Sequence, residues 1–541
     1  MTAATHARTD CLVIGAGAAG AVYAVQAARA GLHVTLITGA RELHASNSLW
    51  AQGGIIYDGH DHGDGDLLRA DIDAASGHSA NPAAVDAIVR DGPRLVRELL
   101  IDDLQVAFDR DDGGALRFTR EASHSRHRII YAKDHTGRAI LTALHRRLAE
   151  LADGGALPGG GSLTVATGCF AVDLLTLSHS SVDFLDRYRP LSCIGAHVLD
   201  VAAGEVRPIM AKKTVLATGG LGQVYLHSTN DAGAYGHGVA MAYRVGARVI
   251  DMEYVQFHPT VFHRRGERPF LISEAVRGEG GVLINQQGEA FMERYHPDGS
   301  LAPRDVISRS IHSELLRGAS DTVFIDLAGV DADYARRRFP TINARLLAAG
   351  VDMTREPIPV VPAAHYSCGG IHTDMAGNTN IAHLSAIGET ACTGLHGANR
   401  LASTSLLECL VMGATAAGRH AAEIAAGADF HLPAVRPWEM AAAEPDDELI
   451  TQDLNVIRNT MWHYVGLVRT AKRLDRAGNL LRELKNEIDG FYADNALTPR
   501  LLALRNAVQT ALLITYAALR NPRSAGCHYR NDSLDRTRPR T

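Results

Sequence analysis

The apolar and polar positions at the start of the chain predict a strand, a helix and a second strand. Residues 10–15 (DCLVIG) form a short apolar run typical of a buried strand, residues 18–30 are rich in alanine and typical of a helix, and residues 33–38 (HVTLIT) repeat the strand pattern. This order predicts a βαβ unit with parallel strands. The expected fold class is therefore α/β, or α+β when the whole chain is included.

The middle of the chain changes its pattern. A glycine-rich loop is expected at 153–161, a strand at 214–220 (TVLATGG) and a helix at 236–250. From 251 to 362 short strand and helix patterns are mixed, which we interpret as an inserted second domain.

The last third of the chain predicts mainly helices. A glycine-rich stretch at 368–397 precedes an expected alanine-rich helix at 405–426 and a linker with proline and acidic residues at about 427–447. Residues 448–520 show helical periodicity and predict a C-terminal helical segment.

Composition narrows the class of protein. A length of 541 residues predicts several domains, and 46% hydrophobic with 21% charged residues is typical of a globular chain. A formal net charge of −6 without a basic stretch argues against a nucleic-acid partner. The N-terminus lacks a signal-peptide pattern and no uncharged apolar run reaches about 18 residues, so we expect a cytoplasmic protein without a membrane segment. The seven cysteines form no CxxC pair, so no metal or iron–sulfur site is expected.

A glycine motif joins the first strand to the first helix. Gly15-Ala16-Gly17-Ala18-Ala19-Gly20 is a GxGxxG sequence, whose glycines allow a tight turn, a close backbone approach to a pyrophosphate, and close packing of helix on strand. The same motif can be a purely structural turn, but its flanking strand and helix favour a dinucleotide site.

Other segments favour FAD over NAD. An acidic residue usually ends the second strand, but Thr38 stands there, so ribose recognition is not of the common carboxylate type. The polar segment Asn47–Gly54 and the pair Gly219 and Gly220 add two further glycine-flanked loops. Several such loops around one extended cofactor suit FAD better than NAD.

Together these motifs resemble a known family. GAGAAG, SNSLWAQGG, LATGG, GLHGANRLASTSLLE and RSAGCHYRND, in that order, are similar to the succinate dehydrogenase/fumarate reductase flavoprotein superfamily, and within it to the L-aspartate oxidase family. The resemblance runs from about residue 10 to about residue 532. It implies a Rossmann-like FAD-binding domain in two parts (1–240 and 363–430), an inserted capping domain (241–362) and a C-terminal helical domain (431–541).

The resemblance also implies a set of FAD contacts. Asn47 occupies the position at which membrane-complex relatives carry a flavin-linking histidine, and an amide cannot form that bond, so FAD is expected to be held non-covalently. His237 stands where the family usually has aspartate, which leaves one expected contact in doubt. The full set implied is Gly15, Ala16, Gly17, Ala18, Ala19, Gly20, Thr38, Asn47, Ser48, Leu49, Trp50, Ala51, Gln52, Gly53, Gly54, His237, Glu389, Ser405 and Leu406.

The substrate groups implied by the resemblance suit a four-carbon diacid. We expect Arg400 and His365 on one carboxylate and His258 with Ser273 on the other, since an arginine fork binds a carboxylate with two parallel hydrogen bonds. Gln256 belongs to the same expected site.

Two further residues are given distinct roles. The arginine matching Arg304 delivers a proton in the reductase relatives, and simple carboxylate binding is the alternative for Arg304. Glu121 is expected to pair with the ammonium group of L-aspartate, which succinate lacks, and a surface glutamate is the alternative.

The function implied is FAD-dependent oxidation of L-aspartate to iminoaspartate. Electrons would pass to oxygen or to fumarate, which becomes succinate, as the first step of NAD biosynthesis, and the family role suggests quinolinate synthase as a partner. A soluble fumarate reductase or a succinate dehydrogenase flavoprotein subunit is the main alternative, against which Asn47 and Glu121 argue. A redox-inactive FAD- or NAD-binding protein is the other, favoured only by His237.

Overall fold

A computed structural model describes most of the chain, and it covers residues 7–57, 64–121, 123–154, 157, 159–264, 266–267, 269–318, 320–428 and 430–532. Part of the loop predicted at 153–161, and the outer ends of the first and last predicted domains, lie outside these residues.

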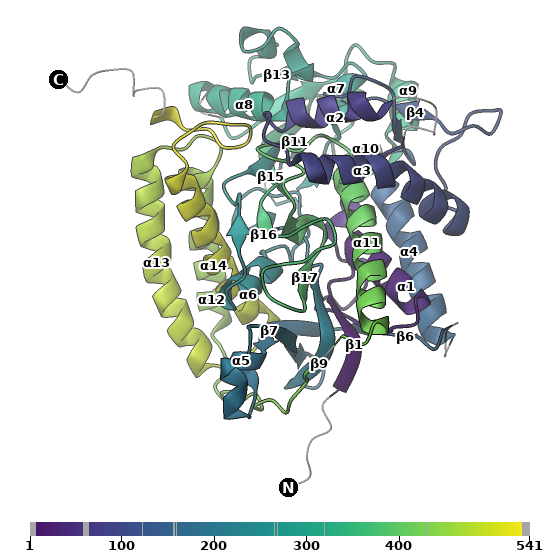
Figure 1. Ribbon diagram of the computed structural model, residues 1–541. Coiled ribbons are helices and arrows are strands. Elements are labelled where there is room, and N and C mark those ends of the chain that lie inside the picture. Colours follow the sequence, from purple (N-terminus) through teal and green to yellow (C-terminus); the bar gives the residue numbers. More distant parts are fainter. Residues whose placement is uncertain are drawn as a thin grey trace.

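A mixed sheet forms the base of the larger body (Figure 1). The strand order is β6-β2-β1-β9-β8-β7 with β17 beside β9, and only the β7–β8 and β8–β9 pairs are antiparallel among the described residues. The parallel part is apolar on both faces because helices cover it. The strands are β1 (Ala7–Ile14), β2 (His33–Thr38), β6 (Ser162–Thr167), β7 (Cys169–Thr176), β8 (Cys193–Asp200), β9 (Glu205–Leu216) and β17 (Leu384–Ala386).

Helices far apart in sequence cover this sheet. Helix α1 (Ala18–Arg29) packs against α11 (Ser405–Ala425), and α4 (Thr136–Asp153) lies beside α1 (Figure 1). The alanines of α1 permit this packing because they let backbones approach closely. The βαβ unit and the helix predicted at 405–426 are confirmed, each within a few residues.

Two predicted elements are too long. The strand predicted at 214–220 ends at Leu216, because Gly219 adopts a left-handed backbone (φ +72°) that no strand continues. The helix predicted at 236–250 is α6 (His237–Arg244), and Gly246 (φ +90°) turns the chain into the short strand β10 (Val249–Ile250).

A second, antiparallel sheet forms a separate body above the first. Its order is β12-β11-β15-β14-β13, and its core of residues between Phe262 and Val360 is distinct from that of the larger body. The domain boundaries at 240, 362 and 430 stay a prediction. The elements are β11 (Val255–Phe262), β12 (Phe270–Leu271), α7 (Glu274–Gly278), β13 (Val282–Ile284), α8 (Arg304–Gly318), β14 (Val323–Asp326), α9 (Ala332–Arg338), α10 (Pro340–Ala348) and β15 (Ile358–Ser367).

Three long helices near the C-terminus flank the larger body (Figure 1). They are α12 (Asp447–Val465), α13 (Ala471–Asp494) and α14 (Pro499–Arg520), which confirms helix for most of 448–520. Helix α14 is long and apolar enough to cross a membrane by composition, but 78% of its apolar window is buried inside the protein. Its side chains therefore serve as the core of this helical group.

Short elements complete the larger body. They are η1 (Asn47–Trp50), β3 (Ile55–Ile56), α2 (Asp64–Ala75), α3 (Pro82–Leu95), the π-helical turn η2 (Val96–Asp103), β4 (Phe118–Thr119), β5 (Ile129–Ile130), α5 (Leu177–Ser180), η3 (Phe184–Tyr188), β16 (Gly370–His372), η7 (Gly388–Thr390) and β18 (Ala391–Cys392).

The packing of α1 on β1 gives a stability prediction. A Cβ at Gly20 would lie 2.0 Å from the carbonyl oxygen of Gly15, so we expect Gly20→Ala to force α1 off the sheet and destabilise the protein by about 1–3 kcal/mol or more. Helical Gly418 is exposed and has no atom within 4 Å of an added Cβ beyond its own helix backbone, so Gly418→Ala is expected to stabilise by up to about 1 kcal/mol. Thermal unfolding of both variants measures the contrast, and equal shifts would contradict it.

Candidate active site

One cavity of about 470 Å³ runs from the N-terminus of α1 to the underside of the second sheet. Except for Gly20, which lies behind it, every predicted FAD contact lines this cavity. Of the predicted substrate residues, Gln256 is the one that does not line it.

The glycine motif shapes one arm of the cavity. Gly15 has φ +118° and passes so close to the next strand that a Cβ would lie 2.2 Å from the Ala217 carbonyl oxygen. Gly17 begins α1 with its Cα facing open space, where the nearest side-chain atom is 3.6 Å from an added Cβ. This leaves the positive end of the helix dipole accessible to a pyrophosphate.

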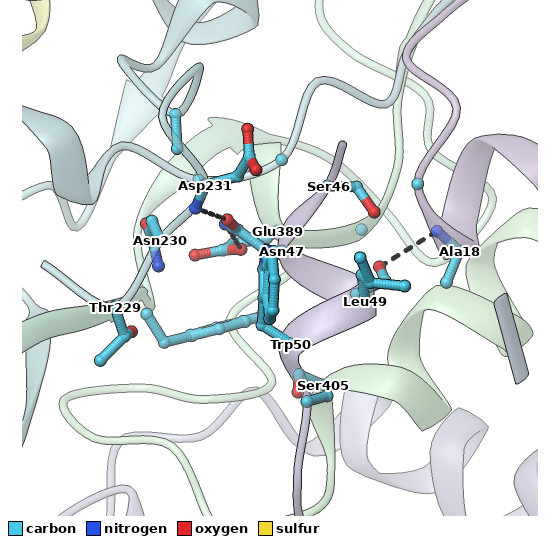
Figure 2. A pocket seen from close by; sticks show the side chains of 18 of the residues that line it. Ala18, Ser46, Asn47, Leu49, Trp50, Thr229, Asn230, Asp231, Glu389 and Ser405 are labelled. Carbon is cyan, nitrogen blue, oxygen red and sulfur yellow. Dashed lines mark hydrogen bonds between the residues drawn. The ribbon is translucent and has the colours of Figure 1, made fainter. Parts of the chain in front are cut away.

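A polar cluster holds the loop after the motif in place. Figure 2 shows Asn47 between Asp231 and Glu389: its Oδ1 accepts from the Asp231 backbone N–H at 2.8 Å, and its Nδ2 donates to Glu389 Oε2 at 3.3 Å. The Ser48 hydroxyl accepts from the backbone N–H of Ala18 at 3.1 Å. Asn47 is therefore a structural link at the position of the flavin-linking histidine.

The chemistry of this arm fits a bound dinucleotide. The buried hydroxyl oxygen of Ser46 has no hydrogen-bond partner among the described residues, and Gly219 leaves space that a side chain would fill. Burial raises the pKa of Glu389 to about 7, so this carboxyl is ready to donate or accept a hydrogen bond beside Gly220. Donors from a helix end and adaptable polar groups suit the phosphates and hydroxyls of FAD.

Two arginines converge at the other end of the cavity. Arg304 begins α8 of the second body, whereas Arg400 precedes α11 of the first. The Oε1 of Gln256 accepts from Arg304 Nη1 at 3.3 Å and from Arg400 Nη2 at 3.2 Å. Its Nε2 donates to Asn399 Oδ1 and to the Arg400 carbonyl, which sets the direction of the amide. Gln256 thus lies behind the two forks and joins them.

The two predicted histidines come from neighbouring strands. His258 lies on β11 and His365 on β15, with ring centroids 5.3 Å apart. Burial and the nearby arginines hold the pKa of both well below the ordinary value, so both rings are neutral. The backbone N–H of Thr260 donates to His258 Nδ1 at 3.2 Å, which leaves the proton on Nε2 as a donor.

An acidic residue that the sequence analysis did not assign balances Arg304. Glu274 follows Ser273, which caps α7, and accepts from Arg304 Nε at 2.6 Å. Arg277 lies 3.9 Å beyond Glu274. Burial disfavours the charge of Arg304, but Glu274 and Glu121 outweigh it and raise the pKa above its ordinary value. The polar run Ser273-Glu274 was the one signal in the sequence for this role.

Glu121 lies at the edge of the same cluster. Its Oε2 accepts from the Ser403 hydroxyl at 2.8 Å, and its Oε1 would lie 2.5 Å from a Cβ on Gly53. Burial and the charge of Glu274 raise the pKa of Glu121, and Arg304 and Arg400 act in the opposite sense. The structure therefore places a carboxylate opposite the arginines, in a cavity with room for a small ligand. Ser403 was also unassigned, although it belongs to the GLHGANRLASTSLLE motif.

Comparison with known proteins agrees with this geometry. Residues 10–406 match the family described as FAD binding domain, and residues 455–539 match the fumarate reductase flavoprotein C-terminal family. The chain is 42% identical to L-aspartate oxidase 1 of Ralstonia nicotianae over 97% of this chain and 95% of that protein. It is 37% identical to the chloroplastic L-aspartate oxidase of Arabidopsis thaliana over 97% of this chain and 81% of that protein.

The chain belongs to the L-aspartate oxidase family.

Solved structures place this family member in a wider fold group. The flavoprotein FrdA of the E. coli quinol fumarate reductase matches with a TM-score of 0.83 and 27% identity, over 97% of this chain and 91% of that one. Sdh1 of Mycobacterium smegmatis matches with a TM-score of 0.81 and 27% identity, over 97% and 89%. The α/β fold with FAD-binding, capping and C-terminal helical parts, and non-covalent FAD as cofactor, are thereby confirmed.

Glu389 provides a pH prediction. Because its folded pKa is about 7 and its ordinary value is about 4.3, the folded protein holds a proton that the unfolded chain loses between these values. Stability of the FAD-free protein is therefore expected to fall as pH rises from about 4 to about 7, by a contribution on the order of 3 kcal/mol. Urea unfolding at several pH values should show a shallower decline for Glu389→Gln, and parallel profiles would contradict the assignment.

Proposed function

We propose that this chain is an FAD-dependent oxidoreductase that oxidises L-aspartate to iminoaspartate as the first step of NAD biosynthesis. The observation that carries this proposal is the cluster of Arg304, Arg400 and the two histidines at one end of the FAD cavity, with Glu121 opposite. Oxygen or fumarate would take the electrons. FAD, when bound, supplies the two-electron acceptor.

The arrangement supports recognition of both acid groups of the substrate. Arg400 carries no carboxylate partner among the described hydrogen bonds and ion pairs, and its guanidinium lies 4.6 Å from the ring centre of Tyr366. It can therefore offer its fork to an incoming carboxylate, with His365 beside it. The neutral His258, with its Nε2–H donor, and Ser273 suit the second carboxylate. Neutral imidazoles add hydrogen bonds without adding further repulsion between cations.

Glu121 supports selection of an amino diacid. A buried carboxylate gains from an ammonium partner and gains nothing from the apolar methylene of succinate. Its raised pKa also suits it to take up a proton that the ammonium loses as the imine forms.

Arg304 and Glu274 support proton delivery during fumarate reduction. The series Arg304, Glu274 and Arg277 leads away from the cavity, with separations of 2.6 and 3.9 Å. We propose that Arg304 gives a proton to fumarate and regains one through Glu274.

Two further assignments are proposals that rest on the family. We place the protein in the cytoplasm, and we propose that quinolinate synthase consumes its product. Membership of the aspartate-oxidising family and the amide at Asn47 weigh against a succinate dehydrogenase subunit as the function.

Removal of the Glu121 charge tests substrate selection. Anaerobic L-aspartate is expected to bleach the 450 nm flavin band of the wild type, and Glu121→Gln is expected to lower kcat/KM for L-aspartate by about 10- to 100-fold with little change in fumarate reduction. Ser403→Ala removes the hydrogen bond to Glu121 but keeps the charge, and serves as the control with a smaller effect. Equal losses with both substrates in Glu121→Gln would overturn the ammonium-pairing role.

Neutralising Glu274 tests the proton route. Glu274→Gln keeps the shape of the side chain but lowers its ability to pass a proton, so fumarate reduction is expected to slow by about 100-fold or more. Binding of succinate, followed by its effect on the flavin spectrum, should change much less. A rate loss matched by an equal loss of succinate binding would assign Glu274 to the positioning of Arg304 alone.

A further inference from the structure

His237 lies in a defined part of the cofactor cavity. It is the first residue of α6, and its ring meets Phe170 edge-on with centroids 4.9 Å apart. Phe170 in turn lies against Gly39, directly after β2, since a Cβ on Gly39 would be 2.3 Å from its ring. The end of the second strand of such a fold faces the adenosine half of a dinucleotide. His237 is therefore at the adenosine end of the cavity.

A chain of hydrogen bonds determines which ring nitrogen of His237 carries the proton. Asp173 on β7 accepts from Arg244 Nε at 2.7 Å. Arg244 Nη1 donates to Asn506 Oδ1 at 2.8 Å, and arginine has only donors, so the amide oxygen of Asn506 must face it. The Nδ2 of Asn506 then donates to His237 Nδ1 at 3.0 Å. An Nδ1 that accepts has no proton, so the neutral ring carries its proton on Nε2.

The ring is neutral over the working range of pH. Burial lowers the pKa of His237 to about 4, the backbone carbonyl of Gly233 acts in the opposite sense, and the charge of Arg244 lowers it further. Among the neighbouring elements, β7 brings Asp173, α14 brings Arg505 and β16 brings His372. Asp173 is paired with both Arg244 and Arg505 at 2.7 Å, so its charge does not reach the imidazole as a free carboxylate would.

We propose that Asp173, Arg244 and Asn506 lock His237 in the Nε2–H tautomer, so that His237 donates a hydrogen bond to the adenosine half of FAD where an aspartate would accept one. Asn506 is then a positioning residue, contributed to the FAD site by the C-terminal helix α14. This inference rests on FAD being the cofactor of the proposed function. It does not depend on the identity of the amino-acid substrate.

Asn506→Asp tests the lock because it reverses the preference of the neighbouring group. A carboxylate can only accept, so it favours a proton on His237 Nδ1 and raises the pKa of the ring. At low pH the imidazolium keeps its Nε2–H, whereas at high pH the neutral ring has Nδ1–H and a bare Nε2. We therefore expect the Kd for FAD of the Asn506→Asp apoprotein to rise by about three- to tenfold as pH increases through neutrality. The wild-type Kd is expected to change little between about pH 5.5 and 8.5.

The measurement is quenching of FAD fluorescence on binding to apoprotein, without any substrate. Gln509→Glu is the matched control: it adds a carboxylate to the same helix at a half-buried position with no hydrogen bond to His237 among the described residues, and its Kd should be independent of pH. In the double variant Asn506→Asp/His237→Ala the pH dependence should disappear. A pH dependence that persists without His237, or one that is absent from Asn506→Asp, overturns the proposal.

Asn506→Leu provides an independent readout if the aspartate variant does not fold. Without the Nδ2 donor the ring can populate both tautomers, so FAD binding should weaken by about two- to fivefold at every pH. An unchanged Kd would overturn the lock. Failure of the wild type to bind FAD at all would instead overturn the cofactor of the proposed function.

Discussion

Two buried guanidinium groups that share one amide oxygen are the constraint on which the active site depends. Arg304 and Arg400 repel each other, yet both donate to Gln256 Oε1. Such a pair is stable only where each charge has another partner. Arg304 is balanced by Glu274, whereas Arg400 rests on the face of Tyr366. The site thus keeps a surplus of positive charge that a dicarboxylate can satisfy.

The same constraint explains why the site lies between two bodies. Arg304 belongs to the body of the second sheet and Arg400 to that of the first, and the strand of Gln256 passes between them. Other contacts tie the bodies together: Asp134 accepts from the backbone N–H groups of Thr341 and Ile342 at the start of α10, and Gln52 donates to the Leu271 carbonyl. A shift of one body would separate the arginines and open the cavity at once.

The FAD arm is organised by a different principle. Its groups are mostly backbone atoms and neutral polar side chains, held by contacts such as those of Asn47 with Asp231 and Glu389. Even the C-terminal helices take part, because Asn506 of α14 reaches His237. Cofactor and substrate regions therefore differ in charge, and the difference orders the cavity from the adenosine end to the diacid end.

The sequence by itself determined the features that depend on short spacing. The GxGxxG turn, the βαβ unit and the helix after Ser405 arise from contacts within a few residues, so local pattern sufficed to predict them. The ends of β9 and α6 were missed, because Gly219 and Gly246 could have continued either element until their backbone angles were set by tertiary packing. Motif resemblance supplied Arg304, His258, His365 and Arg400, but not their partners. The bridge at Gln256, the pairing of Glu274 and the tautomer of His237 join residues tens to hundreds of positions apart. Only the folded chain brings those atoms within hydrogen-bond distance, so only the tertiary structure decided them.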